Sequence, residues 1–250
     1  MSEAPENKSF WDHLEDLRGS LIRILVSVVV FSVLAFCFKD LLFKVVLAPK
    51  SSTFFMYKLF GGGDFSINLI NTGLTEQFMI HMKTAFAFGV LLSSPYILKV
   101  LFDFVRPALY ENERKHSVSL VVAAYVMFLI GVVVSYLFVF PLTVRFLGTY
   151  SVSDQVGNML TLQSYMDTLL MLSLIFGVLF EIPVLSWLLA RFGLLKAEWM
   201  TRYRRHAIVV ILVLSAIITP TGDAFTLIIV ALPIWLLYEL SVLVVRRTNP

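Results

Sequence analysis

The sequence predicts an all-α protein whose helices span a membrane. Of its 250 residues, 58% are hydrophobic and 15% are charged, whereas soluble domains average roughly 45–50% and about 25%. Mean hydropathy is +0.85, and the basic residues lie between long apolar runs. Only helices or closed barrels satisfy the backbone in lipid, and these runs lack the period-2 alternation of barrel strands. The three observations together favour a bundle of apolar helices.

Six apolar runs are candidates for spans, since a spanning helix needs about 17–25 residues. They are Leu21–Phe38, Gln77–Leu101, Ser117–Phe140, Leu160–Ala190, His206–Thr219 and Phe225–Val245. The fourth could reach about 46 Å, so we expect it to tilt or to kink at Pro183. The core of the fifth, Ala207–Ile218, reaches only about 18 Å, against a hydrocarbon core of about 30 Å. Spans of such unequal length predict a curved, concave wall with a short fifth span.

The segment before the first run has a pattern of its own. Ser9 followed by Asp12 resembles a capping box, and Trp11, Leu14 and Leu17 recur at helical spacing. This pattern predicts an interfacial helix within residues 1–20 on the cytoplasmic surface. The membrane domain would then cover 21–245 and a short tail 246–250. No basic n-region or small-residue cleavage site is found, so we expect the first run to be retained.

The distribution of Lys and Arg predicts the orientation. With six spans both termini lie on one side, and that side carries 14 of the 20 basic residues. Cytoplasmic loops are enriched in Lys and Arg, so both termini should be cytoplasmic. The basic residues form no continuous stripe, which argues against nucleic-acid binding.

The sequence carries no signature of enzymatic chemistry. The four histidines lie on different segments without metal-binding spacing, and the glycine run at 61–63 lacks the ending of a phosphate-binding P-loop. No G-x-S-x-G motif is present, and the single Cys37 excludes an internal disulfide. We therefore expect no catalysis, no metal and no cofactor.

Acidic residues are the strongest functional candidates. Glu181 lies deep in the fourth run, where a buried carboxylate costs at least a few kcal/mol and usually marks a functional site. The alternative is a neutral acid bonded to a nearby backbone carbonyl. Glu15 and Asp16 precede the first run, while Glu111 and Glu113 follow the second. Two such clusters facing one compartment could bind paired arginines through forked hydrogen bonds; ordinary solvated loop acids are the alternative.

Five motifs occur in order along nearly the whole chain. They are HLEDLR at 13–18, LAP at 47–49, SP at 94–95 with FVRPALYENER at 104–114, FGVLFEIP at 176–183, and TP at 219–220 followed by Asp223, Pro233, Tyr238 and Glu239. In this order they resemble the TatC family, the polytopic core of the twin-arginine protein translocase. The glutamate of the family's HLxELR pattern falls on Asp16, while Glu15 occupies a variable position. Either acid, or both, could take its role.

The resemblance implies a receptor for twin-arginine signal peptides. Such a receptor serves the Sec-independent export of folded proteins across the bacterial inner membrane, driven by the proton-motive force. It implies that Glu113 and Asp16 bind the Arg-Arg pair, with Phe104 and Tyr110 shaping the site and Arg18 orienting the acids.

The resemblance also implies partners and structural residues. The single-span proteins TatA and TatB would dock along the fifth and sixth spans, and the receptor would self-associate. Glu181 would project into the groove of the wall, where it could meet a polar group of a partner helix. Pro49, Pro107 and Pro183 would be structural residues of loops and a kink.

A different reading is a proton- or cation-coupled transporter of small solutes that uses Glu181. Transporters of this kind often contain internal repeats, and none is found here. A solvent-lined cavity around Glu181 would favour the transporter, whereas an open concave surface facing lipid would favour the receptor.

Overall fold

The computed structural model describes residues 10–59, 67–105, 117–150, 159–219 and 223–248. The longer helices are α1 (Phe10–Cys37), α4 (Glu76–Val105), α6 (Ser117–Val134), α8 (Leu162–Leu179), α11 (Arg204–Ile218) and α12 (Ala224–Thr248). The shorter elements are α2 (Lys39–Val46), η1 (Ala48–Lys50), α3 (Phe55–Leu59), β1 (Leu69–Ile70), η3 (Ser135–Val139), α7 (Phe140–Thr149), β2 (Leu160–Thr161), α9 (Ile182–Arg191) and α10 (Ala197–Arg202).

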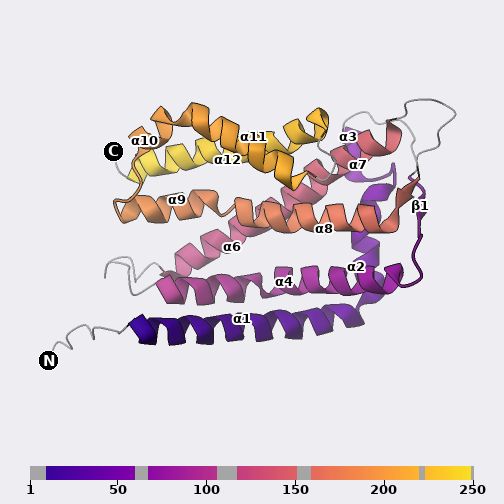
Figure 1. The fold of residues 1–250 in the computed structure, drawn as a ribbon, viewed down its shortest axis with the longest axis horizontal. Coiled ribbons are helices and arrows are strands. Elements are labelled where there is room, and N and C mark those ends of the chain that lie inside the picture. The colour runs from indigo at the N-terminus through magenta and orange to yellow at the C-terminus, as the bar shows by residue number, and fades with distance from the viewer. Residues whose placement is uncertain (1–9, 60–66, 106–116, 151–158, 220–222, 249–250) are drawn as a thin grey trace.

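The long helices run nearly parallel or antiparallel to one another (Figure 1). The pair α1 and α4 packs side by side and antiparallel, α8 continues into α9 in the middle of the molecule, and α12 lies beyond them with α11 against it. The rod formed by α6, η3 and α7 crosses this row diagonally. Both described ends of the chain lie at the end of the molecule where α4 and α9 finish.

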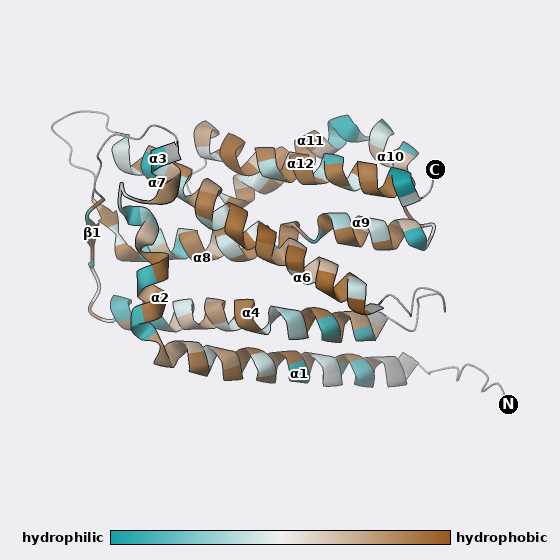
Figure 2. Cartoon of the chain, turned by 180° about the vertical axis from the view of Figure 1, so that it is seen from behind, coloured by the Kyte–Doolittle hydropathy of each residue, from teal (hydrophilic) through white to brown (hydrophobic). Residues whose placement is uncertain are grey.

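Five helical stretches among the described residues are long and apolar enough to cross a membrane. They are Leu14–Cys37, Glu76–Phe104, Val118–Thr149, Leu162–Arg191 and Ala224–Thr248. Hydrophobic residues cover the middle of these helices, and hydrophilic ones gather toward α2 and α10 at opposite ends (Figure 2). The predicted helical membrane class is thus confirmed. The candidate for the fifth span, α11, has 15 residues, about 22 Å of helix, and is too short to join this set.

Two boundaries differ from those predicted by the sequence. The helix that begins at Phe10 continues without a break to Cys37, so the segment up to Ser20 and the first span form one helix; its position in a bilayer stays a prediction. The third span extends past Phe140 to Thr149 through the π-helix η3. Pro141 at the start of α7 has no N–H to donate, and a shift of hydrogen-bond register is a common way to accommodate this.

The connection between the first two spans contains more structure than its sequence suggests. Helices α2 and α3 and the turn η1 form there, whereas the glycine run at 61–63 lies outside the described residues. The short strand β1 pairs in parallel with β2, with Leu69 opposite Leu160. This pair ties the segment before α4 to the segment before α8.

Three glycines allow close contacts between helices. A Cβ on Gly89 of α4 would lie 2.1 Å from Ser32 Oγ of α1. A Cβ on Gly131 of α6 would lie 2.4 Å from the carbonyl oxygen of Phe176, and one on Gly177 of α8 would lie 2.6 Å from Cε2 of Phe128. Close approach at small residues is typical of membrane helices, which gain little from apolar burial in lipid.

Candidate functional site

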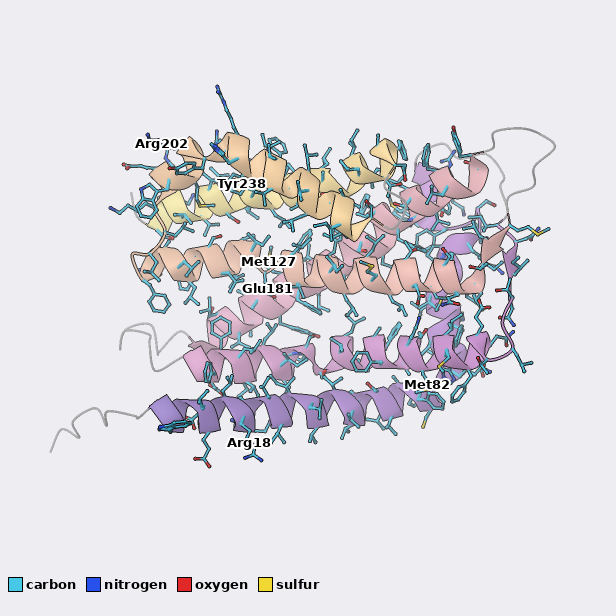
Figure 3. The ribbon with its side chains drawn as sticks, in the orientation of Figure 1. Arg18, Met82, Met127, Glu181, Arg202 and Tyr238 are labelled. Carbon is cyan, nitrogen blue, oxygen red and sulfur yellow. The ribbon has the colours of Figure 1, made fainter. Side chains whose placement is uncertain are left out.

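The acids of the first motif lie at the start of α1. Glu15, Asp16 and Arg18 are exposed there, and Arg18 points away from α4 (Figure 3). The last turn of α4, which holds the half-buried Phe104, finishes at the same end of the molecule because α1 and α4 are antiparallel (Figure 1). The first acidic cluster therefore lies at the end of the molecule where the FVRPALYENER motif at 104–114 begins.

Three predicted site residues cannot be placed. Glu113, Tyr110 and Pro107 lie outside the described residues. Their described neighbours are the end of α4 and the start of α6, and both lie at the α1 start of the molecule (Figure 1).

Glu181 lies at a break between two helices. Helix α8 ends at Leu179 and α9 starts at Ile182, with Pro183 in the first turn of α9, where its missing N–H leaves no hydrogen bond unmade. The N–H of Glu181 donates to the carbonyl of Val178 at 3.1 Å. The long fourth span is therefore interrupted just before Pro183, and the interruption holds the carboxyl group at mid-span (Figure 3).

The side chain of Glu181 borders an apolar pocket. The pocket has a volume of about 350 Å³, and it is lined by Val90, Ser94, Ile97, Leu98, Leu101, Phe102, Phe128, Val178, Glu181, Val184, Leu185 and Leu188. Ser94 is its other polar side chain, and the Ser94 hydroxyl donates to the carbonyl of Leu91 at 2.7 Å. Oε1 of Glu181 is buried and has no hydrogen-bond partner among the described residues, so the bond to a backbone carbonyl considered above is not made by this atom. A mostly hydrocarbon wall does not resemble a polar path for a solute.

The opposite end of the molecule is held by tyrosines that the sequence did not single out. The hydroxyl of Tyr57 donates to the carbonyl of Pro49 at 2.8 Å, Tyr136 to Val45 at 2.6 Å, and Tyr165 to Val46 at 3.0 Å. These bonds give side-chain donors to carbonyls in the last turn of α2 and in η1, where helix ends leave C=O groups without a following helical N–H. Burial raises the pKa of the Tyr57 phenol well above its usual range.

Glu76 joins two helix starts at this same end and was also missed. Its Oε2 accepts from the backbone N–H groups of Thr72 and Gly73 at 2.9 and 2.8 Å. Its Oε1 accepts from the N–H of Gln163, at the start of α8, at 2.9 Å. Acidic residues are common at helix starts, so the sequence around Glu76 gives no sign that its side chain reaches a second helix.

An ion pair and three polar residues of the last motif hold other helices. Nζ of Lys83 lies 2.7 Å from Oδ1 of Asp167 and links α4 to α8. Asp223 caps α12, accepting from the N–H of Thr226 at 2.7 Å. Tyr238 and Glu239 on α12 bind α10 and α11: the Tyr238 hydroxyl donates to the carbonyl of Met200 at 2.6 Å, and Arg204 Nη2 donates to Glu239 Oε2 at 2.8 Å. Within the described ranges, no three His, Cys, Asp or Glu residues are grouped as metal ligands.

Comparison with known proteins shows a match to one protein family over nearly the whole chain. The family model described as Sec-independent protein translocase protein (TatC) matches residues 12–233. The chain belongs to the TatC family.

Individual TatC proteins agree with this assignment. The TatC protein of Desulforapulum autotrophicum is 33% identical over 98% of this chain and 87% of its own length. That of Deinococcus radiodurans is 34% identical over 94% of this chain and 85% of its own. A crystal structure titled twin-arginine translocase receptor TatC has a TM-score of 0.80 and 29% identity, covering 95% of this chain and all of that one.

The TatC assignment confirms the family expected from the five motifs. It does not favour the small-solute transporter. It leaves the roles of the individual residues open, because neither a family match nor a shared fold assigns a function to a given side chain.

Proposed function

We propose that this TatC-family chain is the receptor for twin-arginine signal peptides in a translocase that exports folded proteins. The observation that carries the proposal is the likeness to TatC proteins over nearly the full length, including a twin-arginine translocase receptor of known structure. The chain acts as a binding and translocation component rather than an enzyme, and the proton-motive force supplies the energy.

The proposed recognition site combines the start of α1 with the segment after α4. Asp16, Glu15 or both bind one arginine of the signal peptide, and Glu113 binds the other. The exposed carboxylates at the start of α1 and the antiparallel packing of α1 and α4 support this arrangement. Bidentate pairing favours Arg over Lys, whose ammonium is a point charge without a fork.

Phe104 and Tyr110 shape the same site in this proposal, and Arg18 orients the acids. Phe104 is half-buried in the last turn of α4, close to the segment that carries Glu113. Pro107 belongs to that segment, while Pro49 and Pro183 hold the opposite end of the molecule and the break in the fourth span.

We place the protein in the bacterial cytoplasmic membrane with six spans, α11 being the fifth, arranged as a concave wall with both termini in the cytoplasm. The excess of basic residues on the terminal side supports this orientation. Single-span TatA and TatB dock along α11 and α12, and the receptor self-associates. A 15-residue α11 gives a physical reason for local thinning of the bilayer at that place.

Binding of a fluorescent signal peptide to the purified protein in detergent tests the site. We expect the Arg-Arg peptide to bind more tightly than a Lys-Lys peptide. Asp16→Asn and Glu113→Gln should each weaken binding by roughly 2–5 kcal/mol if the charge pairs are desolvated. Glu198→Gln, an exposed acid on α10, is the matched control and should leave binding unchanged. Full binding by the double variant at positions 16 and 113 would refute the assignment.

A further inference from the structure

A second charged site lies at the end of the molecule where α1 starts, and it is formed by α10, the start of α11 and the end of α12. It is an open pocket of about 970 Å³ whose basic lining residues are Lys196, Arg202, Arg204 and Arg246. Arg204 is paired with Glu239, whereas the other three have no carboxylate partner among the described residues. Among the described residues Glu198 is the single acid that lines the pocket, so these side chains give the site a net positive charge.

Local structure sets the walls of this pocket. Helix α9 ends in a left-handed turn at Gly193 (φ +70°), whose N–H donates to the carbonyl of Ala190 at 2.9 Å, as is common where a glycine follows a helix. The chain then reverses into α10, which the Tyr238 hydroxyl holds against α12 through the carbonyl of Met200. Figure 3 shows Arg202 and Tyr238 toward this end of the molecule. Lys196 and Arg202 are thus held by a hairpin that is fixed against α12, whereas Arg204 and Arg246 belong to α11 and α12.

The other wall of the pocket is apolar and continues along α12. Val242 and Leu243 line it, and Leu243 is 56% exposed. Leu240 and Leu236, at helical spacing from Leu243, are also exposed. A ligand that fills this site therefore contacts cations at one end and, at the other, the exposed side chains of Leu236, Leu240 and Leu243, the leucine stripe of α12.

The depth of the pocket matches the headgroup region of a bilayer. Arg246 lies in the last turn of α12, which starts at Ala224, and 22 residues of helix rise about 33 Å. A hydrocarbon core is about 30 Å thick. If α12 spans the membrane, its basic last turn lies at the level of lipid phosphates, with the leucine stripe beside the acyl chains.

We propose that this pocket binds the headgroup of an anionic phospholipid, with the acyl chains lying along the leucine stripe of α12. Basic pockets between membrane helices recognise such headgroups, and long basic side chains reach the interface readily. A free phosphate or an acidic peptide would use the cations but would leave the apolar wall uncovered. The proposal is independent of signal-peptide recognition and requires only that α12 spans the bilayer.

The test uses the full chain in detergent, titrated with dioleoyl phosphatidylglycerol while native mass spectrometry measures the lipid-bound fraction. Arg202→Gln with Arg246→Gln removes two pocket cations. We expect a roughly 25-fold loss of affinity, since each basic residue at an anionic surface strengthens binding about fivefold. Arg205→Gln with Arg247→Gln removes the same charge from exposed positions outside the pocket and should bind nearly as the unmodified chain does.

Further ligands separate the possible sources of the anion. Dioleoyl phosphatidylcholine should bind weakly and equally to all three proteins, and inorganic phosphate at matched concentration should not displace phosphatidylglycerol. Equal losses in the two double variants, displacement by phosphate, or tighter binding of a hexaglutamate peptide would each overturn the proposal. Thermal unfolding without lipid should be the same for both double variants, which would exclude misfolding as the cause.

Discussion

Replacement of Gly131 by alanine should separate α6 from α8. The added Cβ would lie 2.4 Å from the carbonyl oxygen of Phe176 and 2.9 Å from its carbonyl carbon. These are backbone atoms, so no rotamer change removes the clash. Restoring an ordinary contact of 3.4 Å requires the helices to move apart by about 1 Å.

The cost of this movement can be worked out from two opposing terms. Overpacking a well-packed interior costs typically 1–3 kcal/mol, while alanine gains about 0.5–1 kcal/mol over glycine within a helix. Because the backbone of α8 must give way, we expect a net loss of about 1–2 kcal/mol, or roughly 2–8 °C in Tm for a chain of this size.

Thermal unfolding followed by tryptophan fluorescence, in detergent, measures the effect. Gly19→Ala is the matched control, because a Cβ on Gly19 of α1 meets nothing within 4 Å and should leave Tm unchanged or slightly raised. If Gly131→Ala unfolds at the same temperature as Gly19→Ala, the reasoning that glycine sets the spacing of α6 and α8 is wrong.

Three other substitutions test single polar groups. Glu181→Gln should leave signal-peptide binding intact but impair export in a vesicle transport assay; full export would make Glu181 a structural residue. Tyr57→Phe should lower the free energy of unfolding by about 1–3 kcal/mol, because buried carbonyls lose their donor, whereas Tyr203→Phe at an exposed position should change it little; denaturant unfolding compares them. Glu76→Gln should lower Tm more than Glu198→Gln, because an amide nitrogen faces N–H donors that the carboxylate accepted; equal thermal midpoints would argue against the link between α4 and α8.

The length of the hydrophobic runs predicted most of the fold, because a backbone in lipid has few alternatives to a helix. Runs such as Gln77–Leu101 became helices with ends displaced by a few residues, and the short fifth run became the short α11. The run ending at Phe140 was extended by nine residues, because α7 continues the rod through Pro141 to Thr149. Hydropathy does not mark that continuation, since a proline at a helix start and a proline that ends a helix look alike in sequence.

Long-range polar contacts could not be predicted from the sequence. The hydroxyl of Tyr165 bonds a carbonyl 119 residues away, and Glu76 reaches an N–H 87 residues away. Neither residue has a distinctive neighbour in sequence, since each looks like a common interfacial tyrosine or a helix-capping acid. Such pairs depend on which helices pack together, which periodicity within one run does not specify.

The fourth-span motif separates packing residues from a functional candidate. Gly177 is explained by its contact with Phe128, Phe176 is fully buried in the core, and Pro183 starts α9 where a missing N–H costs nothing. Glu181 has no such account, because its carboxyl group borders an apolar pocket and its Oε1 is buried without a hydrogen-bond partner among the described residues. Keeping an acid there lowers stability relative to an apolar residue of similar size. We propose that a polar group of a partner helix offsets that cost during assembly, and the buried Oε1 of Glu181, which has no hydrogen-bond partner among the described residues, supports this proposal.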